Sequence, residues 1–292
     1  MTKLPSAAAL PRGTFSDEAA RYFFRGEPVN LVYHKMIADV FKSTVNGRTD
    51  WSVIPIENTI DGSVSLHTDW LVHEVELPIR AEWVFPAIQN LVGRADELAA
   101  EGGAGWDPAR IVKVISHPVA MAQCYEFLRS RIPHAELETL SSTAEAIRTV
   151  GENPGRGWAA IGTKTAAADN GLDVLEEAVT DHDNNYTRFL LVGHRAYESE
   201  TATRHKTSVL ITLPEDYPGA LHQVLAAFSW RRINLSRIES RPTKKKLGSY
   251  YFWIDIDMSL DTVLLPAAIA EIEAIGCQVR ILGSYPSFPF EG

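Results

Sequence analysis

The sequence lacks several features that define whole classes of protein. It has only two cysteines in 292 residues, Cys124 and Cys277, too few for a disulfide framework or a zinc cluster. Both lie in apolar surroundings, which is typical of small buried thiols. No run approaches the roughly 20 apolar residues of a membrane-spanning helix, and the N-terminal stretch lacks the pattern of a signal peptide. We therefore expect a cytoplasmic protein that does not contact membranes.

Positive charge is also scarce. Lys and Arg number 28 against 37 Asp and Glu, which gives a formal charge of −9. A binder of the phosphate backbone needs a positive surface, so we expect no nucleic-acid partner. The stretch 231–246 is an exception, with seven cations and one acidic residue, but no aromatic residue is interleaved in it for base stacking. We interpret this stretch as a solvated strand and hairpin.

No familiar catalytic motif is present. The sequence contains no G-x-S-x-G, P-loop, H-E-x-x-H or G-x-G-x-x-G pattern. Its nine histidines are scattered without the spacing of metal ligands. The sequence therefore predicts no metal and no bound cofactor.

The composition is that of an ordinary globular chain, with 45% hydrophobic and 22% charged residues and a length that suits roughly two domains. A polar stretch without apolar periodicity, 197–205, predicts a linker between a first domain, 1–196, and a second, 206–292. In the second domain the pattern is strand, helix, two strands, helix, strand, which predicts an α+β ferredoxin-like unit. Its strands are expected at 207–213, 233–240, 250–258 and 278–282. Such a sheet leaves a face or an edge uncovered, so we expect oligomers.

The first domain alternates apolar runs with helical patterns, which predicts an α/β fold. Its clearest expected strands are 51–56, 111–116, 158–162 and 189–192. Serines stand at four expected helix starts, where each is a candidate N-cap: Ser16, Ser63, Ser116 and Ser142. Ligands of open α/β sheets bind beyond the carboxyl ends of the strands, where helix N-termini offer free N–H groups. The pattern predicts a cleft that holds an anion without a basic surface.

Two polar pairs lie at the mouths of apolar strands. Glu57 and Asn58 follow one strand, and Thr187 and Arg188 precede another. Spacing alone does not decide between capped structural groups and site residues. Arg188 is suited to clamp a carboxylate bidentately. Thr187 is suited to donate to a leaving oxygen, provided that the site is desolvated.

Short motifs run in order along almost the whole chain. Those of the first domain are Gly13-Thr14-Phe15-Ser16, Pro55-Ile56-Glu57-Asn58, Gly62-Ser63-Val64, Ser116-His117-Pro118, Ala122-Gln123-Cys124, Ser142-Thr143-Ala144-Glu145 and Thr187-Arg188-Phe189. Those of the second are Gly219-Ala220-Leu221 and Glu239-Ser240-Arg241-Pro242. In this order the motifs resemble those of bacterial prephenate dehydratases with a C-terminal ACT regulatory domain. The segment Ala9-Leu10-Pro11-Arg12-Gly13 departs from the family's Leu-Gly-Pro pattern and follows a poor strand. We therefore expect a first loop that is built differently.

The resemblance implies two α/β lobes with a cleft between them, similar to type 2 periplasmic binding proteins. It implies the conversion of prephenate into phenylpyruvate with loss of water and carbon dioxide. Aromatisation drives this elimination, so orientation of the substrate and help for the leaving hydroxyl are what the enzyme supplies. The implied catalytic residues are Thr187 as donor to the hydroxyl, Asn58, and Glu57, which bonds the hydroxyl or serves as the acid if burial raises its pKa. The implied substrate-binding residues are Arg188, Ser116, Gln123, Thr68, Ser142, Thr143 and Phe189.

The resemblance also implies that the second domain binds phenylalanine as an allosteric effector between two paired copies, in a homodimer or homotetramer. The implied effector-binding residues are Gly219, Ala220, Leu221, Asn234, Glu239, Ser240, Arg241 and Pro242.

Three other readings stay open at this point. Arogenate dehydration needs the same leaving group. A non-aromatising prephenate decarboxylase needs no donor to the hydroxyl, so the intact Thr187-Arg188-Phe189 argues against it. A non-catalytic amino-acid sensor has little use for Glu57, Asn58 and Thr187 clustered in one cleft.

Overall fold

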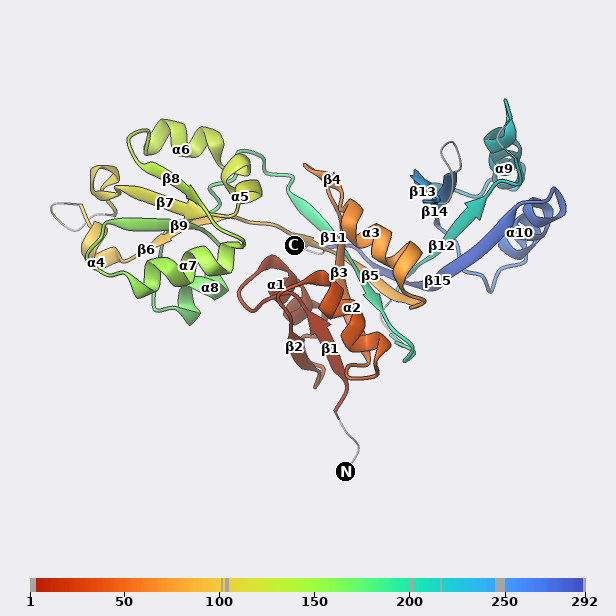
Figure 1. Ribbon diagram of the computed structural model, residues 1–292, viewed down its shortest axis with the longest axis horizontal. Coiled ribbons are helices and arrows are strands. Elements are labelled where there is room, and N and C mark those ends of the chain that lie inside the picture. Colours follow the sequence, from red (N-terminus) through yellow and green to blue (C-terminus); the bar gives the residue numbers. More distant parts are fainter. Residues whose placement is uncertain are drawn as a thin grey trace. The chain divides into compact units, whose positions relative to one another are not determined.

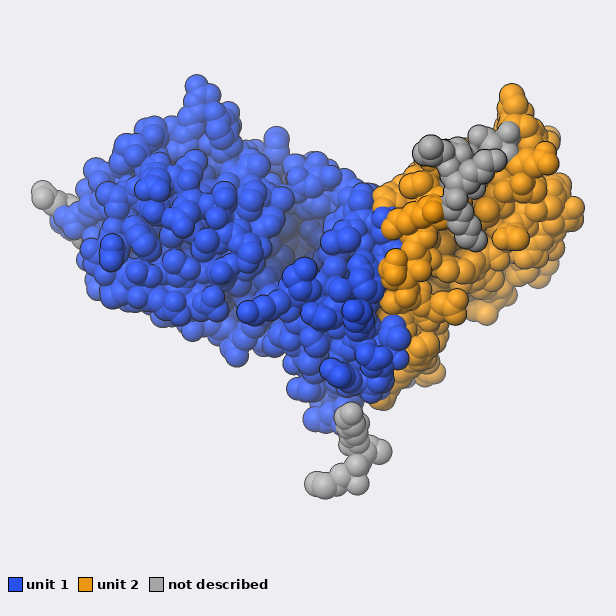
Figure 2. Space-filling view, viewed as in Figure 1, with its two compact units in different colours: residues 1–70, 84–189 blue, residues 71–83, 190–292 orange. Residues whose placement is uncertain are grey.

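The computed structural model describes residues 4–100, 102, 105–199, 202–215, 217–244 and 250–290. The chain divides into two compact units, unit 1 (Met1–Trp70 and Val84–Phe189) and unit 2 (Leu71–Trp83 and Leu190–Gly292) (Figure 2). Within the described ranges no helix is long and apolar enough to cross a membrane. Lys245 and Lys246 of the cationic stretch lie outside the described residues.

The N-terminal part of unit 1 is built on parallel strands. β1 lies between β2 and β3 and is parallel to both, β4 pairs antiparallel with the end of β3, and β11 is the neighbour of β3 on its other side. The strands are β1 (Ser6–Ala9), β2 (Asn30–Tyr33), β3 (Trp51–Asn58), β4 (Gly62–Ser63) and β11 (Tyr186–Val192). The helices are α1 (Phe15–Phe23), α2 (Ile37–Val45) and α3 (Ser65–Asp69).

β1, which lies between β2 and β3, has little intrinsic strand propensity. β1 reads Ser-Ala-Ala-Ala, without a β-branched or aromatic side chain, yet all four residues are buried. Ala19 and Ala20 of α1 are also fully buried, and small side chains on both elements allow the helix to pack close to the sheet. Packing against neighbours therefore overrides intrinsic propensity here.

The second sheet of unit 1 has the strand order β10-β6-β9-β7-β8. Successive side chains of a strand point to opposite faces, and Val114 and Ile115 of β7 accordingly enter two different cores. Val114 packs with residues of α5 and α6, and Ile115 with residues of α7 and α8, so helices cover both faces (Figure 1). The strands are β6 (Asn90–Gly93), β7 (Lys113–Ser116), β8 (Glu136–Thr139), β9 (Trp158–Gly162) and β10 (Asp173–Glu176). The helices are α4 (Ala95–Leu98), η2 (Pro108–Arg110), α5 (Pro118–Gln123), α6 (Tyr125–Arg131), α7 (Thr143–Glu152) and α8 (Lys164–Asp169).

Unit 2 contains the expected ferredoxin-like element order. Its antiparallel strands follow the order β13-β14-β12-β15, and α9 and α10 pack on one face around Val209, Val224 and Ile254. The elements are β12 (Arg204–Thr212), α9 (Ala220–Ser229), β13 (Leu235–Pro242), β14 (Tyr250–Ile256), α10 (Leu264–Ala274) and β15 (Gln278–Phe288). β12 begins inside the stretch expected to be a linker, and β15 runs six residues beyond its expected end at residue 282. The mixed α/β class and the α+β C-terminal domain are confirmed.

Residues 71–83 also belong to unit 2, although they precede it by more than a hundred residues in the sequence. They contain most of the π-helical turn η1 (Trp70–Glu74) and the start of β5 (Ile79–Pro86). Arg280 donates to the carbonyl oxygens of Leu71 (3.2 Å) and Val72 (3.1 Å). The buried Glu82 carboxylate binds the Lys206 ammonium (2.8 Å) and accepts from the Ser287 hydroxyl (2.6 Å). The unit is therefore assembled from two separate stretches of chain.

The structure corrects three of the four expected serine N-caps. Ser142 caps α7 as expected, because its Oγ accepts from the N–H of Glu145 (3.1 Å). Ser16 lies inside the first turn of α1, and Ser63 lies in β4. Ser116 is the last residue of β7, and His117 caps α5 by accepting the N–H of Val119. The predicted positions were wrong because each of these helices starts at least one residue away from where the apolar pattern placed it.

The first loop docks on α8. Gly13 has φ +80°, and an added Cβ would lie 2.9 Å from the Cβ of Ala166. The Thr163 hydroxyl donates to the carbonyl oxygen of Gly13 (2.9 Å). Arg12 makes a bidentate ion pair with Asp169, with N–O distances of 2.7 and 2.8 Å. These contacts hold the loop that departs from the family pattern against the second sheet's helical layer.

We expect Gly13→Ala to destabilise the protein more than Gly62→Ala does. Both glycines have nearly the same φ, +80° and +77°, but only Gly13 has no space for a Cβ. The strain of a positive φ costs about 1–2 kcal/mol in either variant, and overpacking against α8 adds about 1–3 kcal/mol in Gly13→Ala. Urea unfolding measures the free energy of unfolding of each variant. Equal losses would show that the loop does not depend on close packing with α8.

Candidate active site

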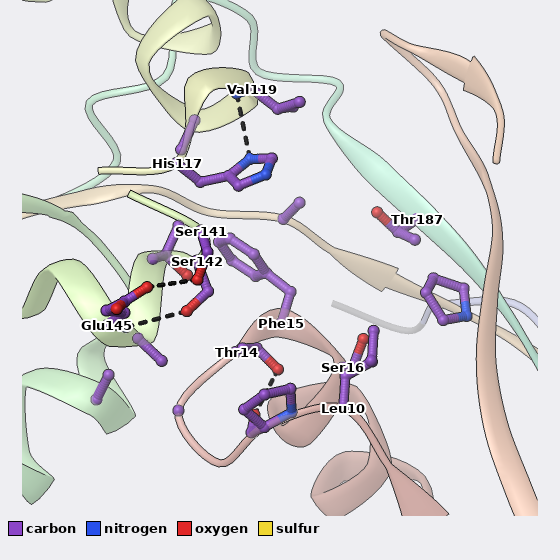
Figure 3. Close-up of a pocket in the computed structure, with 18 of the residues that line it drawn as sticks. Leu10, Thr14, Phe15, Ser16, His117, Val119, Ser141, Ser142, Glu145 and Thr187 are labelled. Atoms are coloured by element: carbon purple, nitrogen blue, oxygen red, sulfur yellow. Dashed lines mark hydrogen bonds between the residues drawn. The ribbon is translucent and has the colours of Figure 1, made fainter. Parts of the chain in front are cut away.

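Unit 1 contains a cavity of about 1080 Å³, and a hollow is visible in the face of this unit (Figure 2). The cavity is lined by residues of the first loop, the turn after β3, the starts of α5 and α7, the end of α8, and β11. Figure 3 shows Thr14, Phe15 and Ser16 on one side and Ser142 and Glu145 on another, with Thr187 on a third. Strands of the first sheet and helices that pack on the second sheet therefore contribute residues to one cavity.

Asn58, at the end of β3, organises the polar wall of this cavity. Its Oδ1 accepts from the backbone N–H groups of Ile60 (2.8 Å) and Asp61 (3.0 Å). This fixes which side of the amide carries the nitrogen. The Nδ2 group donates to Asn185 Oδ1 (2.8 Å), to Thr187 Oγ1 (3.0 Å) and, at 3.2 Å, to the backbone carbonyl of Tyr186.

This arrangement sets the role of the Thr187 hydroxyl. Because Thr187 Oγ1 accepts from Asn58, its own hydrogen is directed to another acceptor. Thr187 lines the cavity, so the hydroxyl is available as a donor to a ligand there. Asn58 and Thr187, predicted from distant parts of the sequence, are brought into direct contact.

The strand alternation separates Thr187 from its neighbour Arg188. β11 begins at Tyr186, three residues before its expected start, so Thr187 and Arg188 lie within the strand and point to opposite faces. Thr187 and Phe189 line the cavity, whereas Arg188 lies 3.5 Å from the Glu57 carboxylate. Glu57 is separated from Asn58 in the same way on β3. The structure thus does not bring Arg188 or Glu57 to the cavity, where a carboxylate clamp and an acid were expected.

Ser116 and Thr68 are not cavity residues either. Both are fully buried, and both use their hydroxyl hydrogens within the protein. Ser116 donates to the carbonyl of Ile161 (2.7 Å), and Thr68 donates to that of Val64 (3.2 Å). Among the other expected substrate-binding residues, Gln123, Ser142 and Thr143 do line the cavity.

The charges around the cavity are balanced. The cations are Arg12, Lys35 and Arg148, and the acidic residues are Asp61, Glu145 and Asp169. A hydrogen bond from Ser141 lowers the pKa of Glu145, with a smaller contribution from nearby cations. Burial lowers the pKa of His117, whose Nδ1 accepts the N–H of Val119 and so carries no hydrogen. In the described part of the chain no group of three or more His, Cys, Asp or Glu side chains is arranged to hold a metal ion.

Two buried amides of the site were not predicted as site residues. Asn185 donates to Gln123 Oε1 (2.9 Å), and Gln89 donates to the same oxygen (3.3 Å). Gln123 in turn donates to Asp61 Oδ2 (2.8 Å). Asn185 stands two residues before Thr187. Side chains two residues apart on an extended chain point to the same side, so this spacing could have indicated Asn185 as a site residue. Nothing in the local sequence distinguishes Gln89.

The expected effector residues lie at two places in unit 2. Gly219, with φ +93°, precedes α9, which begins with Ala220 and Leu221. Residues Glu239 to Pro242 form the last half of β13, where Arg241 binds the Glu239 carboxylate (3.1 Å). Asn234 precedes β13 and donates to Asp257 (2.6 Å). Because α9 leads into β13 through a short connection, the start of α9 and the end of β13 lie toward the same end of the unit.

Comparisons with known proteins identify the family. The model of the prephenate dehydratase family matches residues 9–197, and that of the ACT domain matches residues 207–275. A prephenate dehydratase of Bacillus subtilis is 38% identical over 284 residues, which cover 95% of this chain and 97% of that protein.

Two similar solved structures carry different functional descriptions, and the first agrees with this assignment. The crystal structure of prephenate dehydratase from Arthrobacter aurescens in complex with L-Phe has a TM-score of 0.83 at 32% identity and covers 97% of this chain and 90% of that one. A structure described as GqqA, a novel type of quorum quenching acylase, has a TM-score of 0.80 at 25% identity, with coverage of 97% and 98%. Fold likeness alone does not specify a reaction. The sequence models and relatives do define the family, and this chain belongs to the prephenate dehydratase family with a C-terminal ACT domain.

Proposed function

We propose that this chain converts prephenate into phenylpyruvate in the cavity of unit 1, with Thr187 as the donor to the departing hydroxyl. The observation that carries the proposal is the contact of Asn58 with Thr187, which leaves the threonine hydrogen free to point to a ligand. Family membership supports the same reaction.

The reaction asks little of the protein beyond orientation and one donor. The bond between the ring and its carboxylate breaks, carbon dioxide leaves, and the electron pair completes the aromatic ring. The bond between the ring and its hydroxyl breaks at the opposite position. The hydroxyl takes up one proton, supplied ultimately by solvent, and leaves as water. A hydrogen bond that strengthens as the oxygen becomes basic lowers this barrier, and it acts most strongly in a site from which water is excluded.

The start of α7 is the proposed site for a substrate carboxylate. Ser142 and Thr143 line the cavity there, and the free N–H groups and dipole of this ten-residue helix favour an anion. Ser142 Oγ accepts from the helix, so its hydrogen is available to a carboxylate oxygen. Lys35 and Arg148 add positive charge at the cavity wall. These groups replace Arg188 as the proposed anion-binding set, with Gln123 and Phe189 as further contacts.

We propose that phenylalanine is the allosteric effector and that it binds at the start of α9 and the end of β13. The structure of the Arthrobacter aurescens relative in complex with L-Phe supports this ligand. We propose a homodimer or homotetramer, because β13 is a terminal strand of the order β13-β14-β12-β15 and exposes Ile238. We also propose a cytoplasmic location, which two buried free cysteines favour.

Thr187→Val should lower kcat by about 10²- to 10⁴-fold, the usual contribution of a positioned proton donor. KM should change little, because valine fills the same space. Thr187→Ser keeps the hydroxyl and should retain most of the activity. Glu57→Gln should also remain active, since Glu57 lies on the other face of β3. Formation of phenylpyruvate, followed by its ultraviolet absorbance, measures all three, and near-full turnover by Thr187→Val would exclude Thr187 as the donor.

Equilibrium dialysis with labelled phenylalanine tests the effector site. Gly219 and Gly276 have φ of +93° and +94°, and neither lacks space for a Cβ, so alanine imposes similar strain at both. We expect Gly219→Ala to weaken phenylalanine binding by roughly tenfold, because about 1–2 kcal/mol of strain falls on the loop proposed to bind it. Gly276→Ala should bind as the unaltered protein does. Equal binding by both variants would place the effector elsewhere.

Sedimentation equilibrium tests the assembly. We expect a mass of two or four chains of 32.3 kDa. A charged residue on the terminal strand, Ile238→Lys, should shift the equilibrium toward single chains if the edge of β13 is part of the interface. A single-chain mass for the unaltered protein would contradict the proposed oligomer.

A further inference from the structure

Gln89 has a buried acceptor that nothing in the described structure satisfies. The side chain is 3% exposed and lines the cavity of unit 1. Its Nε2 donates to Gln123, but its Oε1 has no hydrogen-bond partner among the described residues. Buried polar atoms are rarely left without a partner, because their lost hydration is not compensated. An unsatisfied acceptor in a cavity wall therefore points to a ligand that brings a donor.

The orientation of this acceptor is fixed by a series of hydrogen bonds. The series starts at Asn58, whose Oδ1 accepts two backbone N–H groups, so that its Nδ2 must face Asn185. Asn185 therefore presents Oδ1 to Asn58 and Nδ2 to Gln123. Each amide has one donor side and one acceptor side, and the polarity of the first amide is passed to the next.

The same logic continues to Gln89. Gln123 presents its Oε1 to Asn185 and its Nε2 to the Asp61 carboxylate, which accepts only. Rotating the Gln123 amide would place two acceptors against each other at Asp61. Gln89 must therefore turn Nε2 toward Gln123 Oε1. If Gln89 were rotated, its oxygen would meet the oxygen of Gln123, so Gln89 Oε1 is held as the acceptor for the ligand.

The proposed substrate offers one donor. Prephenate carries two carboxylates and a ketone, and none of these three groups has a hydrogen to donate. Its ring hydroxyl both accepts and donates hydrogen bonds. This step rests on the proposed function, since it takes prephenate as the ligand of this cavity. A fixed acceptor in the wall matches the hydroxyl and repels the carboxylates, so it favours one orientation of the substrate.

We propose that Gln89 Oε1 accepts a hydrogen bond from the substrate's ring hydroxyl. Thr187 donates a hydrogen bond to the oxygen of that hydroxyl, and the hydroxyl in turn donates its own hydrogen bond to Gln89 Oε1. Both residues line the cavity and belong to one hydrogen-bonded set through Asn58, Asn185 and Gln123. When the hydroxyl leaves as water, Gln89 Oε1 remains as an acceptor for one of its hydrogens. Gln89 is thereby a substrate-binding residue that discriminates for the hydroxyl group.

Two saturated-ring analogues of prephenate test this inference without turnover, because a saturated ring cannot aromatise. One carries the ring hydroxyl, and the other carries fluorine in its place, which has a similar size and no hydrogen to donate. In the unaltered protein we expect the hydroxyl analogue to be the tighter competitive inhibitor by about 10- to 100-fold, because the fluorine analogue leaves Gln89 Oε1 unsatisfied.

Gln89→Leu removes the acceptor and should lower this ratio of inhibition constants by tenfold or more. Gln89→Met, which is closer to glutamine in shape, serves the same purpose if the leucine variant does not fold. Val119→Ala is the matched control, because Val119 lines the cavity outside the hydrogen-bonded set. It should shift both inhibition constants together and leave their ratio unchanged.

The outcomes separate this inference from the proposed function. A ratio that stays the same in a folded Gln89 variant, while the unaltered protein converts prephenate, overturns the assignment of Gln89 alone. Failure of the unaltered protein to convert prephenate or to bind either analogue overturns the proposed function, and the assignment of Gln89 with it.

Discussion

Two backbone N–H groups in the turn after β3, those of Ile60 and Asp61, determine the polarity of the hydrogen bonds along the wall of the cavity in unit 1. They bind Asn58 Oδ1 and so decide which way its amide faces. From there the direction of each hydrogen bond follows, to Thr187 on one branch and through Asn185 to Gln123 on the other. Neutral amides and a hydroxyl have no charge to fix their direction, so a site built from them depends on an anchor of this kind.

The cavity is lined by residues of the first sheet of unit 1 and of the helices on the second sheet, and side-chain bonds connect these two sides. Gln123 of α5 donates to Asp61 beside β4, and Arg12 of the first loop binds Asp169 of α8. Each of these bonds joins a residue on one side of the cavity to a residue on the other side. The distance between hydrogen-bond donors on the two sides therefore depends on these bonds. Prearranged donors of this kind need no reorganisation as the substrate's oxygen becomes basic, which is the main requirement for an elimination driven by aromatisation.

The sequence was most informative where its hydrophobic period was regular. The strand and helix order of the C-terminal domain could be predicted because Val209, Val224 and Ile254 belong to clean apolar patterns. The local sequence Ser-Ala-Ala-Ala predicts only a poor strand at β1. The strand forms because it packs closely with α1, and no local sequence pattern reveals that contact. In the site, the resemblance predicted Asn58 and Thr187 as residues of one cleft, but not their direct hydrogen bond. The sequence did not predict that Arg188 points away from Thr187, because the expected start of β11 lay three residues too late. Gln89 is recognised as a site residue only through contacts with residues distant in the sequence.

The discontinuous make-up of unit 2 bears on how its regulatory domain is to be isolated. A fragment that begins at the stretch after residue 196 retains Lys206 and Arg280 but loses Glu82 and the carbonyls of residues 71 and 72 that these cations bind. It would also lose the parallel pairing of Ser287 and Phe288 with Glu82 and Trp83. Cutting the chain between the two family matches, at residues 197–207, therefore leaves Lys206 and Arg280 without these partners and leaves the end of β15 without its neighbouring strand. An isolated domain that keeps these contacts needs residues 71–83 as well, either added as a peptide or joined by circular permutation.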